Sequence, residues 1–130
     1  MNRPSFAFSR LSPSTFVVQY GADEDLRPER QGPLVAALRD ASRHGPLAVV
    51  FVVGAAVRIV SMSVPTFWLE QVEPLRITTV AVVSPSMAVR VATASFGAAN
   101  ALLGRALRVK PFVDEGTAIA WARAAAPAGS

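Results

Sequence analysis

Two apolar segments, Leu47–Val53 and Ile77–Val83, constrain the fold of this chain more than any other part of its sequence. Successive side chains of a strand point to opposite faces of a sheet, so a strand without polar alternation must be covered on both faces. Both segments are short and rich in valine, which is typical of buried strands. We therefore expect them to lie side by side at the centre of a mainly parallel sheet, with helices packed on its faces.

A helix is expected before the first of these strands, over residues 33–42. Pro33 suits a first helical turn, and Leu34 and Leu38 recur at helical spacing. Arg43–Pro46 then combines a basic residue, a glycine and a proline, which are typical of a helix end.

Two further helices are expected, one before and one after the second apolar strand in the sequence. The first begins near Ser63 and ends at Pro74. In the second, Ser84 is expected to be the N-cap and Pro85 the first helical residue, with a break or end within Gly97–Gly104. The apolar residues of this second helix recur at helical spacing: Met87, Val91, Ala94 and Ala98.

The remaining elements lie towards the two ends of the chain. Ser5–Ser9 and Thr15–Tyr20 are expected to pair as antiparallel strands across a turn at 11–14. Arg105–Phe112 alternates between polar and apolar residues, which suits an edge strand, and Asp114 is expected to cap a last helix. Strands and helices therefore alternate along most of the sequence, as in a parallel α/β fold.

Length and composition agree with a single domain. The chain has 130 residues, and its 52% apolar content is enough for one hydrophobic core. Without cysteine it has neither disulfides nor thiolate metal ligands. We expect one α/β domain over residues 1–125, with a mostly parallel sheet of four to five strands and about four helices, and a disordered C-terminal tail at 126–130.

The same features indicate a cytoplasmic protein. Residues 1–6 lack the pattern of a secretory signal, and the longest apolar run, 47–57, is far shorter than the ~20 residues of a membrane-spanning helix. The basic residues give a net charge of +4 but are spread along the chain. Nucleic-acid binding is therefore not expected, because it requires a clustered basic surface.

From Phe16 to Ala124 the chain resembles the STAS-like superfamily, the fold of bacterial anti-sigma-factor antagonists, and especially its small stand-alone members. The resemblance lies in the order of the elements and in these segments: Val80–Ser86, Arg90, Phe96, Val109–Phe112 and Asp114–Trp121. It implies a regulatory domain that works by protein–protein interaction in partner switching or signalling. In that family a serine or threonine after the central strand is phosphorylated, and Ser61 and Ser63 are the matching residues here.

The neighbourhood of these serines departs from the family pattern. Val60 replaces the acidic residue usually found before the phospho-acceptor, and the following glycine is missing. A few residues further along the sequence, three bulky residues follow one another, Phe67, Trp68 and Leu69. They cannot all face one side of a helix. The candidate residues for binding a protein partner, or for self-association with a second copy of the chain, are Arg58, Ser61, Ser63, Phe67 and Trp68.

The turn Ser84-Pro85-Ser86 is a candidate anion site. It follows a central strand at the edge where open α/β sheets bind ligands, and Arg90 lies one helical turn further on. A phosphate or lipid-headgroup module is therefore the alternative to a protein-binding domain. The same turn also fits a plain helix cap, because serine is common at helix starts.

No catalytic residues, cofactor or metal site are predicted. His44 is the only histidine, and its position at a helix end suits capping. The acidic run Asp23–Asp25 lacks the spaced ligands of a calcium loop and is typical of solvated surface. The residues thus favour a binding protein over an enzyme.

Overall fold

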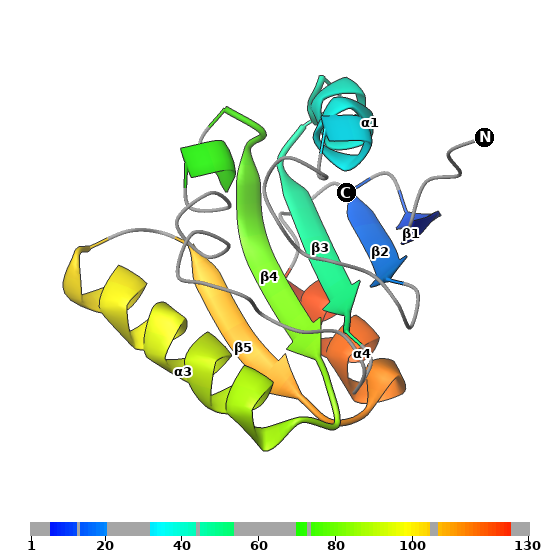
Figure 1. Cartoon of the computed structure of the whole chain (residues 1–130). Coiled ribbons are helices and arrows are strands. Elements are labelled where there is room, and N and C mark those ends of the chain that lie inside the picture. The colour runs from blue at the N-terminus through cyan, green and yellow to red at the C-terminus, as the bar shows by residue number, and fades with distance from the viewer. Residues whose placement is uncertain are drawn as a thin grey trace.

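A five-stranded sheet forms the centre of the part of the chain that the computed structural model describes, residues 6–12, 14–20, 32–43, 45–53, 70–72, 74–104 and 107–125 (Figure 1). The strands are β1 (Phe6–Ser12), β2 (Thr15–Tyr20), β3 (Leu47–Val52), β4 (Ile77–Val83) and β5 (Arg108–Phe112). They lie in the order of the sequence, β1-β2-β3-β4-β5. The β1 strand is antiparallel to β2, and the other neighbours are parallel.

The two apolar segments pair as the sequence predicts. In the parallel ladder of β3 and β4, Val49 is opposite Val80 and Val50 is opposite Ala81. The β3 strand is buried from Leu47 to Phe51 on both of its faces. On β4 the buried residues alternate with half-buried ones, so one face of that strand is more closely covered than the other. The α/β fold with a mostly parallel sheet is confirmed.

Three helices pack on this sheet: α1 (Gly32–Ser42), α3 (Met87–Leu102) and α4 (Glu115–Ala125). Residues 70–72 form a further short helical stretch. Parallel strands that follow one another in sequence order, joined by right-handed crossovers, put their crossover helices on one face. Leu38 of α1 and Phe96 of α3 accordingly pack into the same cluster around Val49. We call this the first face of the sheet.

The opposite, second face of the sheet is covered by α4 (Figure 1). Ala118 and Ala122 of this helix pack against Val50 and Ala81, and Trp121 lies at the margin of the same cluster. The rings of Phe112 and Trp121 are 5.5 Å apart between centroids. Since alanine side chains are short, α4 lies close to the strands.

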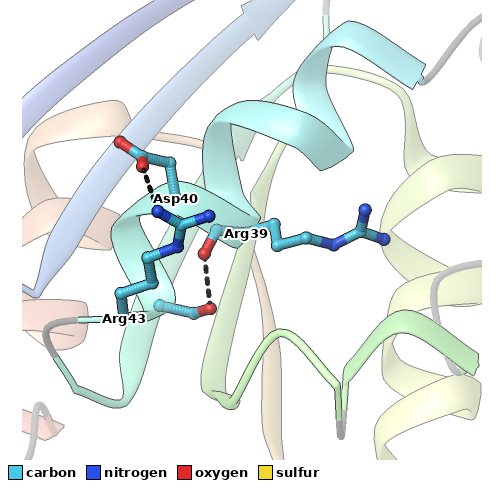
Figure 2. Close-up of polar contacts among 4 residues, drawn as sticks. Arg39, Asp40 and Arg43 are labelled. Atoms are coloured by element: carbon cyan, nitrogen blue, oxygen red, sulfur yellow. Dashed lines mark hydrogen bonds and ion pairs between the residues drawn. The ribbon is translucent and has the colours of Figure 1, made fainter.

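The end of α1 contains the predicted stop signals. Ser42 Oγ donates to the Arg39 carbonyl at 2.7 Å, and Arg43 Nη1 lies 3.7 Å from Asp40 Oδ1, while the Arg39 side chain points away (Figure 2). Gly45 has a φ of +141°, a conformation that favours glycine, and its N–H donates to the Ser42 carbonyl.

Two strand boundaries differ from those expected. The β1 strand continues to Ser12, so the predicted turn at 11–14 is shorter, because residues 10–12 still pair with β2 across a bulge. The β5 strand begins at Arg108 and not at Arg105. Of the predicted second helix, only residues 70–72 and 74 lie within the described residues.

The α3 helix begins later than expected and ends within the predicted range. Its N-cap is Ser86, two residues after the predicted Ser84, and it runs without a break through Gly97 to Leu102, inside the Gly97–Gly104 range predicted for its end. A Cβ at Gly97 would lie 2.8 Å from the Val109 carbonyl oxygen. Gly97 is therefore a close-packing position against β5 and not a helix breaker. Gly104, with a φ of +70°, follows the end of the helix.

Candidate functional site

The predicted protein-interaction residues lie outside the part of the chain that the structure describes. These residues are Arg58, Ser61, Ser63, Phe67 and Trp68. The acidic run Asp23–Asp25 and His44 also lie outside it. Their roles therefore stay predictions.

The structure does bring together Ser84, Ser86 and Arg90. Ser84 directly follows β4, is fully buried, and its N–H donates to the Phe112 carbonyl at 3.0 Å. Its Oγ accepts a hydrogen bond from the Ser86 N–H at 3.1 Å. The buried Ser84 hydroxyl thus holds the turn before α3 and has no surface exposed to a ligand.

Ser86 and Arg90 complete this turn. Ser86 Oγ accepts from the Val89 N–H at 3.4 Å, which is the bond of a helix N-cap. Arg90 Nη1 donates to the Ser84 carbonyl at 2.9 Å, so the half-buried guanidinium folds back onto the turn. The two hydroxyls and the cation are engaged within the cap, and this geometry favours the capping interpretation of the turn over an anion site.

The outward side of α3 is a second surface, which the sequence did not lead us to expect. Met87 is 70% exposed, Val91 59% and Leu102 88%, whereas the inward side buries Val89 and Thr93. Ala94 and Ala98 are exposed as well. The spacing of Met87, Val91, Ala94 and Ala98 therefore predicted the helix correctly, but these residues point to solvent and not to the sheet.

Polar side chains on the inward side of α3 bond to the helix itself, although the buried Asn100 Oδ1 accepts no hydrogen bond from the described residues. Thr93 Oγ1 donates to the Val89 carbonyl at 2.8 Å, and Asn100 Nδ2 donates to the Phe96 carbonyl at 2.8 Å. Together with Gly97, these short side chains let the helix lie close to β5. The helix thus differs from an ordinary surface helix, because its outward side lacks charged residues while its inward side packs polar side chains beside Val89 and Phe96.

One feature of the sequence could have revealed this surface. Arg90 is the only charged residue among the 16 residues of α3, and it is bonded to the Ser84 carbonyl. A helix with so little charge is unusual at a surface exposed to water. The exposed residues of α3 therefore form an apolar surface of the kind that is typical of interaction sites.

The start of α4, which follows β5 at the carboxyl edge of the sheet, carries a carboxylate cap. Asp114 Oδ2 accepts from the Thr117 N–H at 2.7 Å and from Thr117 Oγ1 at 2.8 Å. These bonds, first that from the backbone, lower the pKa of the Asp114 carboxyl. The predicted cap of the last helix is confirmed, and it is anionic where the cap of α3 is neutral.

Among the described residues, no three or more histidine or acidic side chains gather closely enough to hold a metal ion. No helix in this part of the chain has both the length and the apolar character needed to cross a bilayer. Comparisons with protein-family models, curated proteins and solved structures found no match to this chain. The fold and the uncharged outward side of α3 are thus the features that bear on the function.

Proposed function

We propose that this chain is a non-enzymatic regulatory or adaptor domain that acts in the bacterial cytoplasm by binding protein, and that it is STAS-like in fold. The observation that carries this proposal is the outward side of α3, where Met87, Val91 and Leu102 are exposed. Soluble domains rarely leave several large apolar side chains together in water, because contact with a partner lowers their free energy.

The STAS-like part of the proposal rests on the resemblance and on the order of the elements. Helices and strands alternate along the described residues as the resemblance requires, and β4 leads through the Ser84-Pro85-Ser86 turn into α3. A phosphate on Ser61 or Ser63 would add about 1.5 to 2 negative charges, which is enough to change a neighbouring docking surface. Partner switching through these serines is therefore part of the proposal.

The proposal is tested by capturing partners with purified protein as bait. Val91→Glu puts a charge on the outward side of α3, and Val113→Glu is the matched control, because Val113 is a 66% exposed valine outside the helices. We expect Val91→Glu to lower the amount of a specific captured protein at least tenfold, and Val113→Glu to leave it unchanged.

The surface predicted from sequence is tested in the same assay. Trp68→Ala and Ser63→Glu are expected to change partner capture while the thermal unfolding transition stays cooperative. If neither these variants nor Val91→Glu changes what is captured, the protein-binding proposal is wrong.

Anion binding at Ser84, Ser86 and Arg90 is the alternative function. The position of this turn beyond the carboxyl end of a central parallel strand supports it. The engagement of both hydroxyls and of Arg90 Nη1 within the cap weakens it. A thermal-shift series with inorganic phosphate, nucleotides and a soluble phosphoinositide headgroup decides the matter. Stabilisation that Arg90→Gln abolishes would favour the alternative.

A further inference from the structure

We propose that the outward side of α3 binds the same surface of a second copy of this chain, as an antiparallel helix pair about a two-fold axis. The surface, called the α3 face below, consists of exposed residues only: Met87, Val91, Ala94, Ser95, Ala98 and Leu102. This inference deepens the proposed function, because it names one occupant of the surface on which that function rests.

Charge favours a second copy as the occupant. The chain carries a net charge of +4, so two copies repel each other wherever their cations meet. The α3 face has no charged residue, and two copies can approach there without placing like charges together. In a two-fold contact each surface must be complementary to itself, a condition that an uncharged apolar surface meets.

Helix dipoles select the antiparallel arrangement, because they oppose each other in it. Arg90 lies beside the α3 face and is bonded to the Ser84 carbonyl. In an antiparallel pair centred between Ala94 and Ser95, the two copies of Arg90 are roughly 14 Å apart along the helices, so the two cations do not meet.

The sizes of the side chains fit a crossing at the same centre. About the midpoint between residues 94 and 95, Ala94 meets Ser95 and Val91 meets Ala98 of the other copy. About the same midpoint, Met87 of one copy meets Leu102 of the other. Two helices that cross at an angle are closest at the crossing and separate towards their ends. Small residues at the crossing allow close approach, and larger ones further out fill the widening gap.

The area of the α3 face predicts a weak dimer. The 16 residues of α3 span about 24 Å, and the face is one helix wide. Stable complexes bury about 800 Å² on each partner, more than one helix side supplies. We therefore expect a dissociation constant on the order of 100 µM, a rapidly exchanging dimer.

Sedimentation equilibrium of the purified chain tests the association. Between about 10 µM and about 1 mM, the average mass is expected to rise from that of a monomer towards twice that value. Added salt should strengthen the association, because it screens the repulsion between two cationic copies. Val91→Glu should weaken it at least tenfold, while Val113→Glu, a valine of similar exposure, should not.

Cysteine cross-linking tests the geometry, since the chain has no cysteine of its own. Ser95→Cys lies near the proposed axis and should form a disulfide-linked dimer under mild oxidation. Met87→Cys should not cross-link to itself, because the two copies of residue 87 would be roughly 22 Å apart along the helices. A mixture of Met87→Cys and Leu102→Cys should form the mixed dimer.

Each result decides the inference. A wild-type chain that stays monomeric at the highest concentration overturns it, and so does equal association of the Val91→Glu and Val113→Glu variants. Self-cross-linking of Met87→Cys in preference to the mixed pair overturns the antiparallel geometry. These measurements use the purified chain alone. A monomeric protein whose Val91→Glu variant loses a captured partner would thus refute the dimer and retain the proposed function.

Discussion

The helices α3 and α4 are built from similar residues and begin in similar ways, yet α4 turns alanines towards the sheet and α3 turns its alanines towards solvent. Each is rich in alanine and starts with an oxygen cap after a parallel strand, Ser86 in α3 and Asp114 in α4. In α4 the small side is inward, where Ala118 and Ala122 are completely buried. In α3 the alanines point outward with the large apolar residues.

The positions of the two helices explain the difference. The α4 helix crosses the second face of the sheet and contacts β2, β3, β4 and β5, whereas α3 lies along β5 at the edge (Figure 1). A helix over the middle of a sheet can bury a wide side. A helix at the edge buries only a narrow one, which in α3 is filled by Val89, Thr93 and Asn100. Composition alone therefore does not tell which side of such a helix packs.

Lengthening an alanine in each helix should give the largest contrast between them. Ala118→Leu forces a large side chain into a completely buried site and is expected to lower the free energy of unfolding by about 2 kcal/mol. Ala98→Leu on α3 is exposed and should change it by less than about 0.5 kcal/mol. Urea denaturation checks both at unchanged m-value. Equal losses would mean that α3 is packed on both sides.

Filling Gly97 should show how closely α3 approaches β5. In Gly97→Ala the new Cβ would meet the Val109 carbonyl oxygen, so the loss from the clash should exceed the gain in helix propensity. We expect a net loss of between about 1 and about 1.5 kcal/mol in the free energy of unfolding. Gly32→Ala at the start of α1 is the matched control, because nothing lies within 4 Å of its Cβ. Stabilisation by Gly97→Ala would contradict this close approach.

Removing the neutral cap of α3 should have a smaller effect. Ser86→Ala loses the bond from the Val89 N–H and is expected to lower the free energy of unfolding by about 1 kcal/mol. Because a serine hydroxyl does not titrate near neutral or acidic pH, the loss should be the same at pH 3 and at pH 6. A thermal melt at each pH measures it, and a pH-dependent loss would show that another group takes part in the cap.

The anionic cap of α4 should differ in its pH dependence, and the effect should be the smallest of the series. The folded-state pKa of Asp114 is lowered, so its contribution to stability is present above the ordinary aspartate pKa of about 4 and is lost as the pH falls through the folded value. Asp114→Asn should therefore lower the melting temperature slightly at pH 6 and not at pH 2. An equal effect at both pH values would show that the charge is not what stabilises this cap.

Much of the fold was predictable because it depends on local patterns. The valine-rich runs of β3 and β4, the stop signals after Ser42 and the cap at Asp114 each appear in short stretches of sequence. The start of α3 was misplaced because Ser84 and Ser86 are both suitable caps. Ser84 stays with the strand because it is buried and its N–H donates to the Phe112 carbonyl. This contact joins residues far apart in the sequence, so the sequence alone could not show it.

The candidate sites were predictable to different degrees. Ser84, Ser86 and Arg90 do come together, but as a cap whose bonds the sequence could not specify. The α3 face was missed, because apolar helical spacing ordinarily marks the packed side of a helix. Residues 87–102 carry a single charged side chain, that of Arg90, and this scarcity of charge was visible in the sequence and is the signal that points to this face.

The sequence by itself determined the elements and the parallel sheet, because strand burial, helix stops and caps depend on neighbouring residues. The tertiary structure decided which side of α3 meets the sheet. Val109 of β5 approaches Gly97 so closely that a Cβ does not fit there, and the side of α3 that carries Gly97, Thr93 and Phe96 is turned towards the sheet. Met87, Val91 and Leu102 are left outside by this long-range contact, and it thereby creates the surface on which the proposed function rests.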